Sequence, residues 1–133
     1  MGQPTDDVAA NLAEVRGRIA AAARSVGRDP ASVTLLAVSK MQPEERVLAA
    51  LEAGQRHFAE NRVQEAKARW TPLKPRYRGL ELHLVGPLQT NKVKEALGLF
   101  DWFHTVDRPR LAQALSAELA RTGRLLPCLV EVN

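Results

Sequence analysis

The chain has 133 residues, of which 45% are hydrophobic and 26% charged, as in an ordinary globular domain that can bury a core. No apolar stretch approaches the roughly 20 residues that span a bilayer, and the acidic start lacks the apolar run of a secretory signal. Cys128 is the single cysteine, so an internal disulfide and a cysteine zinc cluster are excluded. We expect Cys128 to be buried in its apolar run, and the protein to be cytoplasmic, without a membrane partner.

The net charge of +4 would permit binding to a polyanion. The arginines, however, are scattered along the predicted helices and are not interleaved with aromatic residues that could stack on bases. We therefore expect no nucleic-acid partner and place most arginines on solvated helix faces. The alternative is a basic nucleic-acid-binding module, whose binding would depend steeply on salt.

The first predicted element is a helix. Apolar residues recur at steps of three and four from Val8 to Val26, which indicates one face of an amphipathic helix. Thr5 or Asp6 can cap its start, and Gly27 sits where a left-handed residue ends a helix.

The rest of the chain alternates strands and helices. Residues 33–39 form an apolar run without clean alternation, which is typical of a parallel strand covered on both faces. Further strands are predicted at 56–60, 80–86, 101–106 and 125–133, and helices at 43–54, 61–70, 90–98 and 107–123, the last capped by Asp107. Residues 71–79 are predicted to be a loop. This order predicts an α/β fold with a parallel sheet, and the absence of a glycine-rich nucleotide motif favours barrel-like winding.

Polar residues at the strand ends form the candidate site, because α/β folds bind ligands beyond the carboxyl ends of their strands. Lys40 follows the first strand, and Asn61 follows the second. The turn after the third strand could bring Gln89, Asn91 and Lys92 to the same edge, or it could be an ordinary connection. Other residues predicted at the strand ends are Ser39, Glu60, Gly86, His104, Thr105, Asp107, Glu131 and Asn133.

Lys40 is the most informative of these residues. An ammonium held at the mouth of an apolar strand is partly desolvated, which favours the neutral, nucleophilic amine. Such an amine can condense with an aldehyde to form a Schiff base. The alternative is a lysine that extends to solvent and covers a sheet edge.

The histidines carry a weaker signal. His83 lies between two leucines and is compatible with a hydrogen-bonded core imidazole, while His57 stands at the strand end away from the candidate site. His104 is compatible with a ligand contact or with a half-buried structural role. Because no histidine pair has metal-ligand spacing and the carboxylates do not cluster in sequence, we expect no metal.

Five segments are recognisable together: "LLAVSKMQP", "AGQRHFAENRVQEAKARW", "LHLVGPLQTNKVK", "FDWFHTVDR" and "LLPCLVEVN". In this order and at these intervals they resemble the pyridoxal 5′-phosphate (PLP) homeostasis proteins, the YggS/PROSC family, related to the N-terminal barrel of alanine racemase. The similarity covers essentially the whole chain. Departures at Ala59, Arg62 and Leu82, where the family often has glycine, tyrosine and an aromatic residue, leave Lys40 untouched.

The resemblance implies a (β/α)₈ TIM-type barrel that holds PLP as an internal aldimine. Lys40 matches the Schiff-base lysine, Asn61 an asparagine that lines the cofactor pocket, and His83 a histidine near the ring. It further implies a role in vitamin B6 homeostasis without robust catalysis, hence no catalytic residues. The implied partners are PLP itself and PLP-requiring apo-enzymes. The resemblance also implies that the complete barrel is a monomer.

The same resemblance implies that the barrel continues past Asn133, because the family has eight strands and its phosphate-binding groups come from the last ones. We therefore expect residues 1–133 to form the N-terminal portion of one PLP-binding barrel domain, with a leading helix and about five parallel strands. A chain limited to this portion would expose the edge of its last strand and could self-associate.

The alternative function is a PLP-dependent, racemase-like enzyme for amino acids. Such an enzyme needs a second base, a tyrosine from another domain. The one tyrosine of this chain, Tyr77, lies in the predicted loop before the third strand, so the resemblance favours the non-catalytic role.

Overall fold

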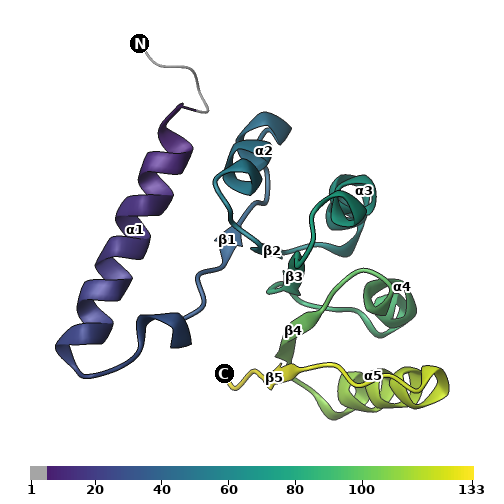
Figure 1. Ribbon diagram of the computed structural model, residues 1–133. Coiled ribbons are helices and arrows are strands. Elements are labelled where there is room, and N and C mark those ends of the chain that lie inside the picture. The colour runs from purple at the N-terminus through teal and green to yellow at the C-terminus, as the bar shows by residue number, and fades with distance from the viewer. Residues whose placement is uncertain (1–5) are drawn as a thin grey trace.

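The computed structural model describes residues 6–133, which fold into five parallel strands that alternate with helices (Figure 1). No helix in this part of the chain combines the length and apolarity that crossing a membrane requires. The strands are β1 (Ala37–Val38), β2 (His57–Glu60), β3 (Glu81–Leu84), β4 (Trp102–Val106) and β5 (Cys128–Val130). The helices are α1 (Asp6–Ser25), α2 (Glu44–Glu52), α3 (Val63–Leu73), α4 (Val93–Leu97) and α5 (Pro109–Thr122). Short 3₁₀ helices occupy Pro30–Ser32, Lys74–Arg76 and Thr90–Lys92.

The strands lie in the sheet in the same order as in the sequence, and every neighbouring pair is parallel. Helices α2 to α5 all lie on one side of the curved sheet (Figure 1). A doubly wound sheet would reverse its strand order at a switch point and carry helices on both faces. The sequential order is instead that of a barrel wall. The predicted α/β fold with a leading helix and five parallel strands is confirmed.

One face of the sheet is buried against the helices. Phe58 of β2, Leu82 and Leu84 of β3 and Phe103 of β4 are all almost fully buried, and the Phe58 ring lies 4.8 Å from Trp70 of α3, centroid to centroid. Burying each such side chain stabilises the fold by about 1.5–3 kcal/mol. Because successive strand residues point to opposite faces, the residues between them are directed to the concave face.

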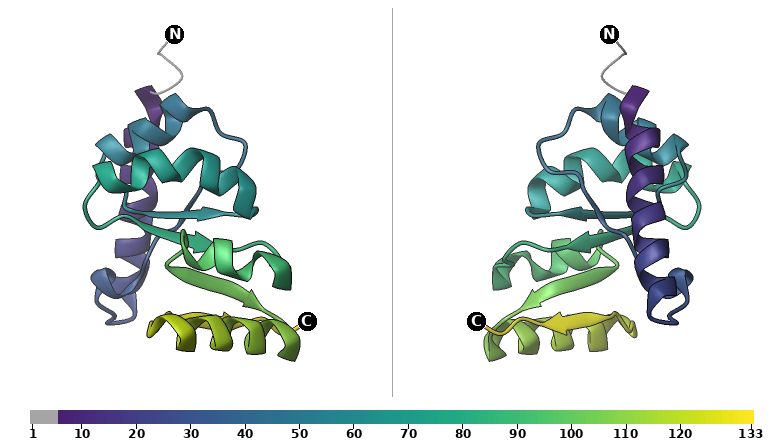
Figure 2. Two further views of the ribbon diagram at one scale, coloured as in Figure 1. Left: turned by 90° about the vertical axis from the view of Figure 1, so that its right-hand side faces the viewer. Right: turned by 90° about the vertical axis from the view of Figure 1, so that its left-hand side faces the viewer.

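Helix α1 runs across the direction of α3, α4 and α5 (Figure 2). Its residues Val8 and Leu12 pack against the core, and its end is marked by Gly27 with a φ of 71°. The predicted leading helix and its left-handed terminating glycine are therefore confirmed. Asp6 opens the helix, while Thr5, the other candidate cap, lies outside the described residues.

Several predicted boundaries are wrong, among them that of β5, which covers Cys128–Val130 instead of residues 125–133. β1 covers only Ala37–Val38 instead of residues 33–39, because within the described chain it is an edge strand that pairs with β2 alone. Helix α3 continues to Leu73, through part of the predicted loop, and a 3₁₀ helix follows at once. Leu73 is buried in the core, and this packing extends the helix across Pro72.

Two side-chain predictions also fail. Cys128 is exposed rather than buried, because it belongs to β5, the other edge strand, all three residues of which are exposed. Asp107 does not cap α5: the capping position is Arg108, without a side-chain cap, and the Asp107 carboxylate accepts a 2.7 Å hydrogen bond from Arg108.

Several arginine side chains bind backbone carbonyl groups, which the composition of the chain did not predict. Arg56, Arg108 and Arg124 each donate to backbone carbonyl oxygens of neighbouring elements, at distances of 2.6–3.2 Å. These bonds satisfy carbonyl groups at helix ends and turns, where the regular backbone pattern stops. Part of the positive charge of the chain therefore belongs to arginines that stabilise the folded structure.

Gly86, after β3, marks a close approach of two backbones. A Cβ atom added there would lie 2.0 Å from the carbonyl oxygen of Asn61. Real Cβ atoms do not approach backbone oxygens so closely, so only glycine lets the turn after β3 pass the turn after β2.

We predict that Gly86→Ala destabilises the chain by about 3 kcal/mol, because the backbone of one turn must move. Gly17→Ala is the matched control: Gly17 lies in α1 with nothing within 4 Å of the added Cβ, so this variant should gain about 0.5–1 kcal/mol. Urea unfolding of both variants measures the difference. Equal stabilities would contradict the close approach.

Candidate functional site

The carboxyl ends of the strands are tied to one another by short polar contacts. The buried Ser39 hydroxyl, after β1, donates a 2.7 Å hydrogen bond to Glu60 at the end of β2. Gly86 packs against the backbone of Asn61, and Thr105 of β4 donates a 2.7 Å hydrogen bond to the Gly86 carbonyl. The polar strand ends predicted from the sequence therefore meet at one edge of the sheet.

Burial raises the pKa of the Glu60 carboxyl, while the Ser39 hydrogen bond and the nearby Arg69 guanidinium act in the opposite direction. A buried carboxylate persists at such a place only when polar partners surround it. Glu60 is thus a structural anchor between β1 and β2, on the helix side of the sheet.

Lys40 lies in a tight turn. The amide of Gln42 donates to the carbonyl oxygen of Ser39 at 3.2 Å, which closes a turn with Lys40 and Met41 at its centre. Lys40 is exposed, so the partial desolvation expected from the sequence is not found in the described chain. The reason is the short edge strand β1: the lysine lies beyond the last residue that β1 pairs with β2, in a turn.

The strand register relates Lys40 to the other two predicted cofactor residues. Val38 is level with Ala59, and Ala59 with His83. Lys40 lies two residues beyond Val38, and Asn61 lies two residues beyond Ala59, so both follow the ends of strands whose last paired residues are level with His83.

Asn61 has a side-chain oxygen that is available to accept a hydrogen bond from a ligand. Its Oδ1 is buried and has no hydrogen-bond partner among the described residues. Buried polar atoms in native proteins nearly always have a partner, and an orphan atom at a strand end is a candidate ligand contact.

His83 belongs to a layer of rings on the concave face. It is 4% exposed, its Nδ1 lies 2.9 Å from Nε2 of His104, and its ring stacks on Trp102 at 5.5 Å and 14°. Burial lowers the pKa of His83 to about 4, with further lowering by His104 and His57. The ring is therefore neutral near pH 7, and its buried Nε2 has no partner within residues 6–133.

The same layer contains a set of groups that sequence reasoning missed. Ligand atoms of His57, Glu81 and His83 lie within 4.8 Å of one another. Such a set could hold a divalent cation, with Glu81 oriented by a 3.1 Å hydrogen bond from Trp102. Register between β2 and β3 brings these residues together, and no spacing along the chain signals it. The expectation that no metal is bound stays a prediction.

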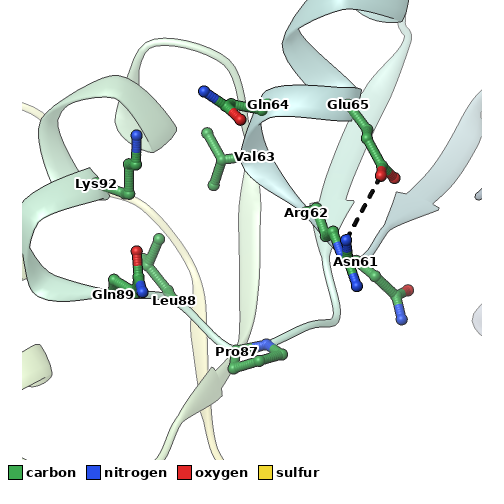
Figure 3. Close-up of a pocket in the computed structure, with 9 residues that line it drawn as sticks. All are labelled: Asn61, Arg62, Val63, Gln64, Glu65, Pro87, Leu88, Gln89 and Lys92. Atoms are coloured by element: carbon green, nitrogen blue, oxygen red, sulfur yellow. Dashed lines mark ion pairs between the residues drawn. The ribbon is translucent and has the colours of Figure 1, made fainter.

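A cleft of about 630 Å³ lies between the start of α3 and the turn before α4 (Figure 3). Gln89 and Lys92 line it, so both lie near the strand ends, and Gln64 and Glu65 face them from α3. The Asn61 amide points away from these side chains (Figure 3). Asn61 nevertheless belongs to the lining of this cleft, so the cleft borders one of the three predicted cofactor residues.

A family model for the alanine racemase N-terminal domain matches residues 7–133. The chain belongs to this family. It is 43% identical over 129 residues to the pyridoxal phosphate homeostasis protein of Escherichia coli K12, a match that covers 96% of this chain and 55% of the relative. The corresponding protein of Vibrio cholerae is 42% identical over 125 residues and is covered to 53%. The resemblance predicted from the sequence is confirmed.

Solved structures agree. PipY of Synechococcus elongatus, solved with PLP bound, superposes with a TM-score of 0.80 at 40% identity over 95% of this chain and 54% of that protein. A protein from Bifidobacterium adolescentis, described as unknown, gives 0.88 at 31% identity over 100% of this chain and 58% of that one. The chain thus spans about half the length of the relatives it matches, and its strands correspond to a portion of the alanine racemase-type barrel.

The lowered pKa of His83 predicts a pH dependence of stability. A histidine whose folded pKa of about 4 lies below its ordinary 6.5 contributes stability above pH 6.5, and this contribution is lost as the pH falls through about 4. The unfolding free energy of the wild type should fall relative to His83→Gln by up to about 3 kcal/mol over that range. Urea unfolding at a series of pH values measures it, and parallel curves would contradict a buried neutral ring.

Proposed function

We propose that this chain is part of a PLP-binding protein of vitamin B6 homeostasis, in which Lys40 carries the cofactor and Asn61 and His83 contact it. The observation that carries the proposal is the relative PipY, which is solved with PLP bound and is 40% identical over 95% of this chain. We propose further that residues 1–133 belong to one PLP-binding domain.

The residues present fit this cofactor. The exposed Lys40 amine can be reached by an aldehyde from solution, and the orphan amide oxygen of Asn61 follows the carboxyl end of the neighbouring strand β2. Neutral His83, one layer deeper, can contact a ring without adding charge. PLP supplies an aldehyde with which the Lys40 nitrogen forms a carbon–nitrogen double bond as the carbonyl oxygen leaves as water.

The proposed role is binding without robust catalysis. A racemase-like reaction needs a second proton-transferring group on the opposite side of the substrate carbon. The single tyrosine, Tyr77, precedes β3 at the amino end of the strands, and its hydroxyl donates a 3.2 Å hydrogen bond to Glu52. Tyr77 is therefore engaged at the edge of the sheet opposite to Lys40, which disfavours the racemase-like alternative.

The proposed partners follow from the chemistry of the cofactor. A protein that holds a reactive aldehyde reversibly can release it to apo-enzymes that require PLP, and we propose these as recipients in the cytoplasm. No nucleic-acid role is proposed, because several arginines are already engaged with backbone carbonyl groups.

We predict that borohydride reduction in the presence of PLP leaves a pyridoxyl mass on Lys40. Hydride converts the carbon–nitrogen double bond to a stable secondary amine, so the modified peptide can be located by mass spectrometry. Lys40→Ala should lose this label, whereas Lys94→Ala should retain it. A label found mainly on Lys92 or Lys94 would refute the assignment.

We also predict no appreciable racemase turnover, because the one tyrosine, Tyr77, is hydrogen-bonded to Glu52 at the amino end of the strands. With PLP and L-alanine in heavy water, the Cα proton should not exchange at enzyme-like rates. Proton NMR measures the exchange, and chiral chromatography measures D-alanine. Rapid deuterium incorporation together with D-alanine would show that the chain is an enzyme.

A further inference from the structure

The turn that carries Lys40 has a strained backbone. Its third residue, Met41, has a φ of 60°, the left-handed region, and is the one non-glycine residue with a positive φ among residues 6–133. Its side chain is 91% exposed, so packing of that side chain does not hold the backbone in place. A non-glycine residue there costs about 1–2 kcal/mol and persists only where the surroundings fix it.

Arg69 of α3 holds both ends of this turn. Its guanidinium donates a 2.6 Å hydrogen bond to the carbonyl oxygen of Ser39, the first residue of the turn, and another to that of Gln42, the last residue. The planar fork of an arginine presents two donor nitrogens in a fixed geometry, whereas a lysine offers a single nitrogen on a flexible stem. The two bonds join a turn and a helix that are 27–30 residues apart in sequence.

A second tether acts on the first residue of the turn from the sheet. The Ser39 amide donates to the Ala59 carbonyl at 3.1 Å, and the Ser39 hydroxyl donates to Glu60 at 2.7 Å. The position of Ser39 is therefore fixed by β2, while Gln42 is held by Arg69. The two ends of the turn are therefore linked by the Gln42–Ser39 backbone hydrogen bond and, from outside the turn, by Arg69.

We infer that Arg69 is a positioning residue for Lys40: it holds the Ser39–Gln42 turn in its left-handed conformation and so fixes where the lysine amine meets the aldehyde. This inference rests on the proposed function of Lys40. Without the two bonds, Met41 relaxes to an ordinary conformation, and Lys40, beside it, changes direction. Arg69 itself need not touch the cofactor.

The test compares three variants with the wild type. Arg69→Ala removes both bonds. Arg69→Ala combined with Met41→Gly removes them but supplies a residue that adopts a φ of 60° without strain. Lys67→Ala is the matched control, because Lys67 lies on the same helix and pairs with Glu95 instead of the turn.

Two quantities are measured for each chain. The absorbance of the Schiff base during a PLP titration gives its apparent dissociation constant. Amide hydrogen exchange of Gln42, whose N–H donates to Ser39, reports on the turn without any cofactor. Circular dichroism establishes that each variant is folded, and Arg69→Lys, which can keep one bond, replaces Arg69→Ala if the alanine variant does not fold.

We expect Arg69→Ala to weaken Schiff-base formation about tenfold, equivalent to about 1.4 kcal/mol, and to speed Gln42 exchange by a similar factor. Added Met41→Gly should recover most of the binding, Arg69→Lys should lose about threefold, and Lys67→Ala should match the wild type. Unchanged binding and exchange in Arg69→Ala, or a loss that glycine does not rescue, would overturn the inference. A wild type that forms no Schiff base at Lys40 would instead refute the proposed function. The exchange rate of the Gln42 amide would still test whether the two Arg69 hydrogen bonds hold the turn.

Discussion

The alternation of side chains along the strands, with one face of the sheet buried under four helices, is the constraint on which the rest of the structure depends. Phe58, Leu82 and Phe103 must face the helices, and this fixes the register of β2, β3 and β4. A slip of one residue would send these side chains to the concave face and is strongly disfavoured. The register in turn decides which polar residues share a layer.

The functional edge follows from that register. Once β1 and β2 are aligned, the Ser39 hydroxyl meets Glu60, and Lys40 lies in the turn that follows. The turn that carries the lysine is then held from two directions, by β2 and by Arg69. Stability and the geometry of the candidate site thus depend on the same contacts, so a change in α3 can affect the proposed cofactor lysine, Lys40, without touching it.

The sequence was most informative where a signal is local. The apolar runs and helix periods predicted the alternation of strands and helices, and the position of Lys40 after an apolar strand predicted a candidate site, which stays a prediction. The length of β1 and the exposure of Cys128 could not be predicted, because they depend on which strands have two neighbours. The left-handed Met41 was also missed, since the turn that contains it is bound by Arg69, which is distant in sequence.

The groups on the concave face illustrate the same limit. His57, Glu81 and His83 each had an unremarkable local context, and only strand register brings their ligand atoms within 4.8 Å. Likewise, the sequence could not predict that the side-chain oxygen of Asn61 is buried without a hydrogen-bond partner, because this depends on which residues surround it in the folded chain. The sequence gives the candidates for such a site, whereas tertiary contacts decide which of them meet.

The most direct test is a crystal structure of the protein grown with PLP. Electron density should be continuous from the Lys40 Nζ to the aldehyde-derived carbon of the cofactor, with Asn61 within hydrogen-bond distance of it and the Ser39–Gln42 turn unchanged. Density for PLP joined to another lysine, or lodged in the cleft beside Gln89 and Lys92 with Lys40 free, would contradict the proposal that Lys40 holds the cofactor.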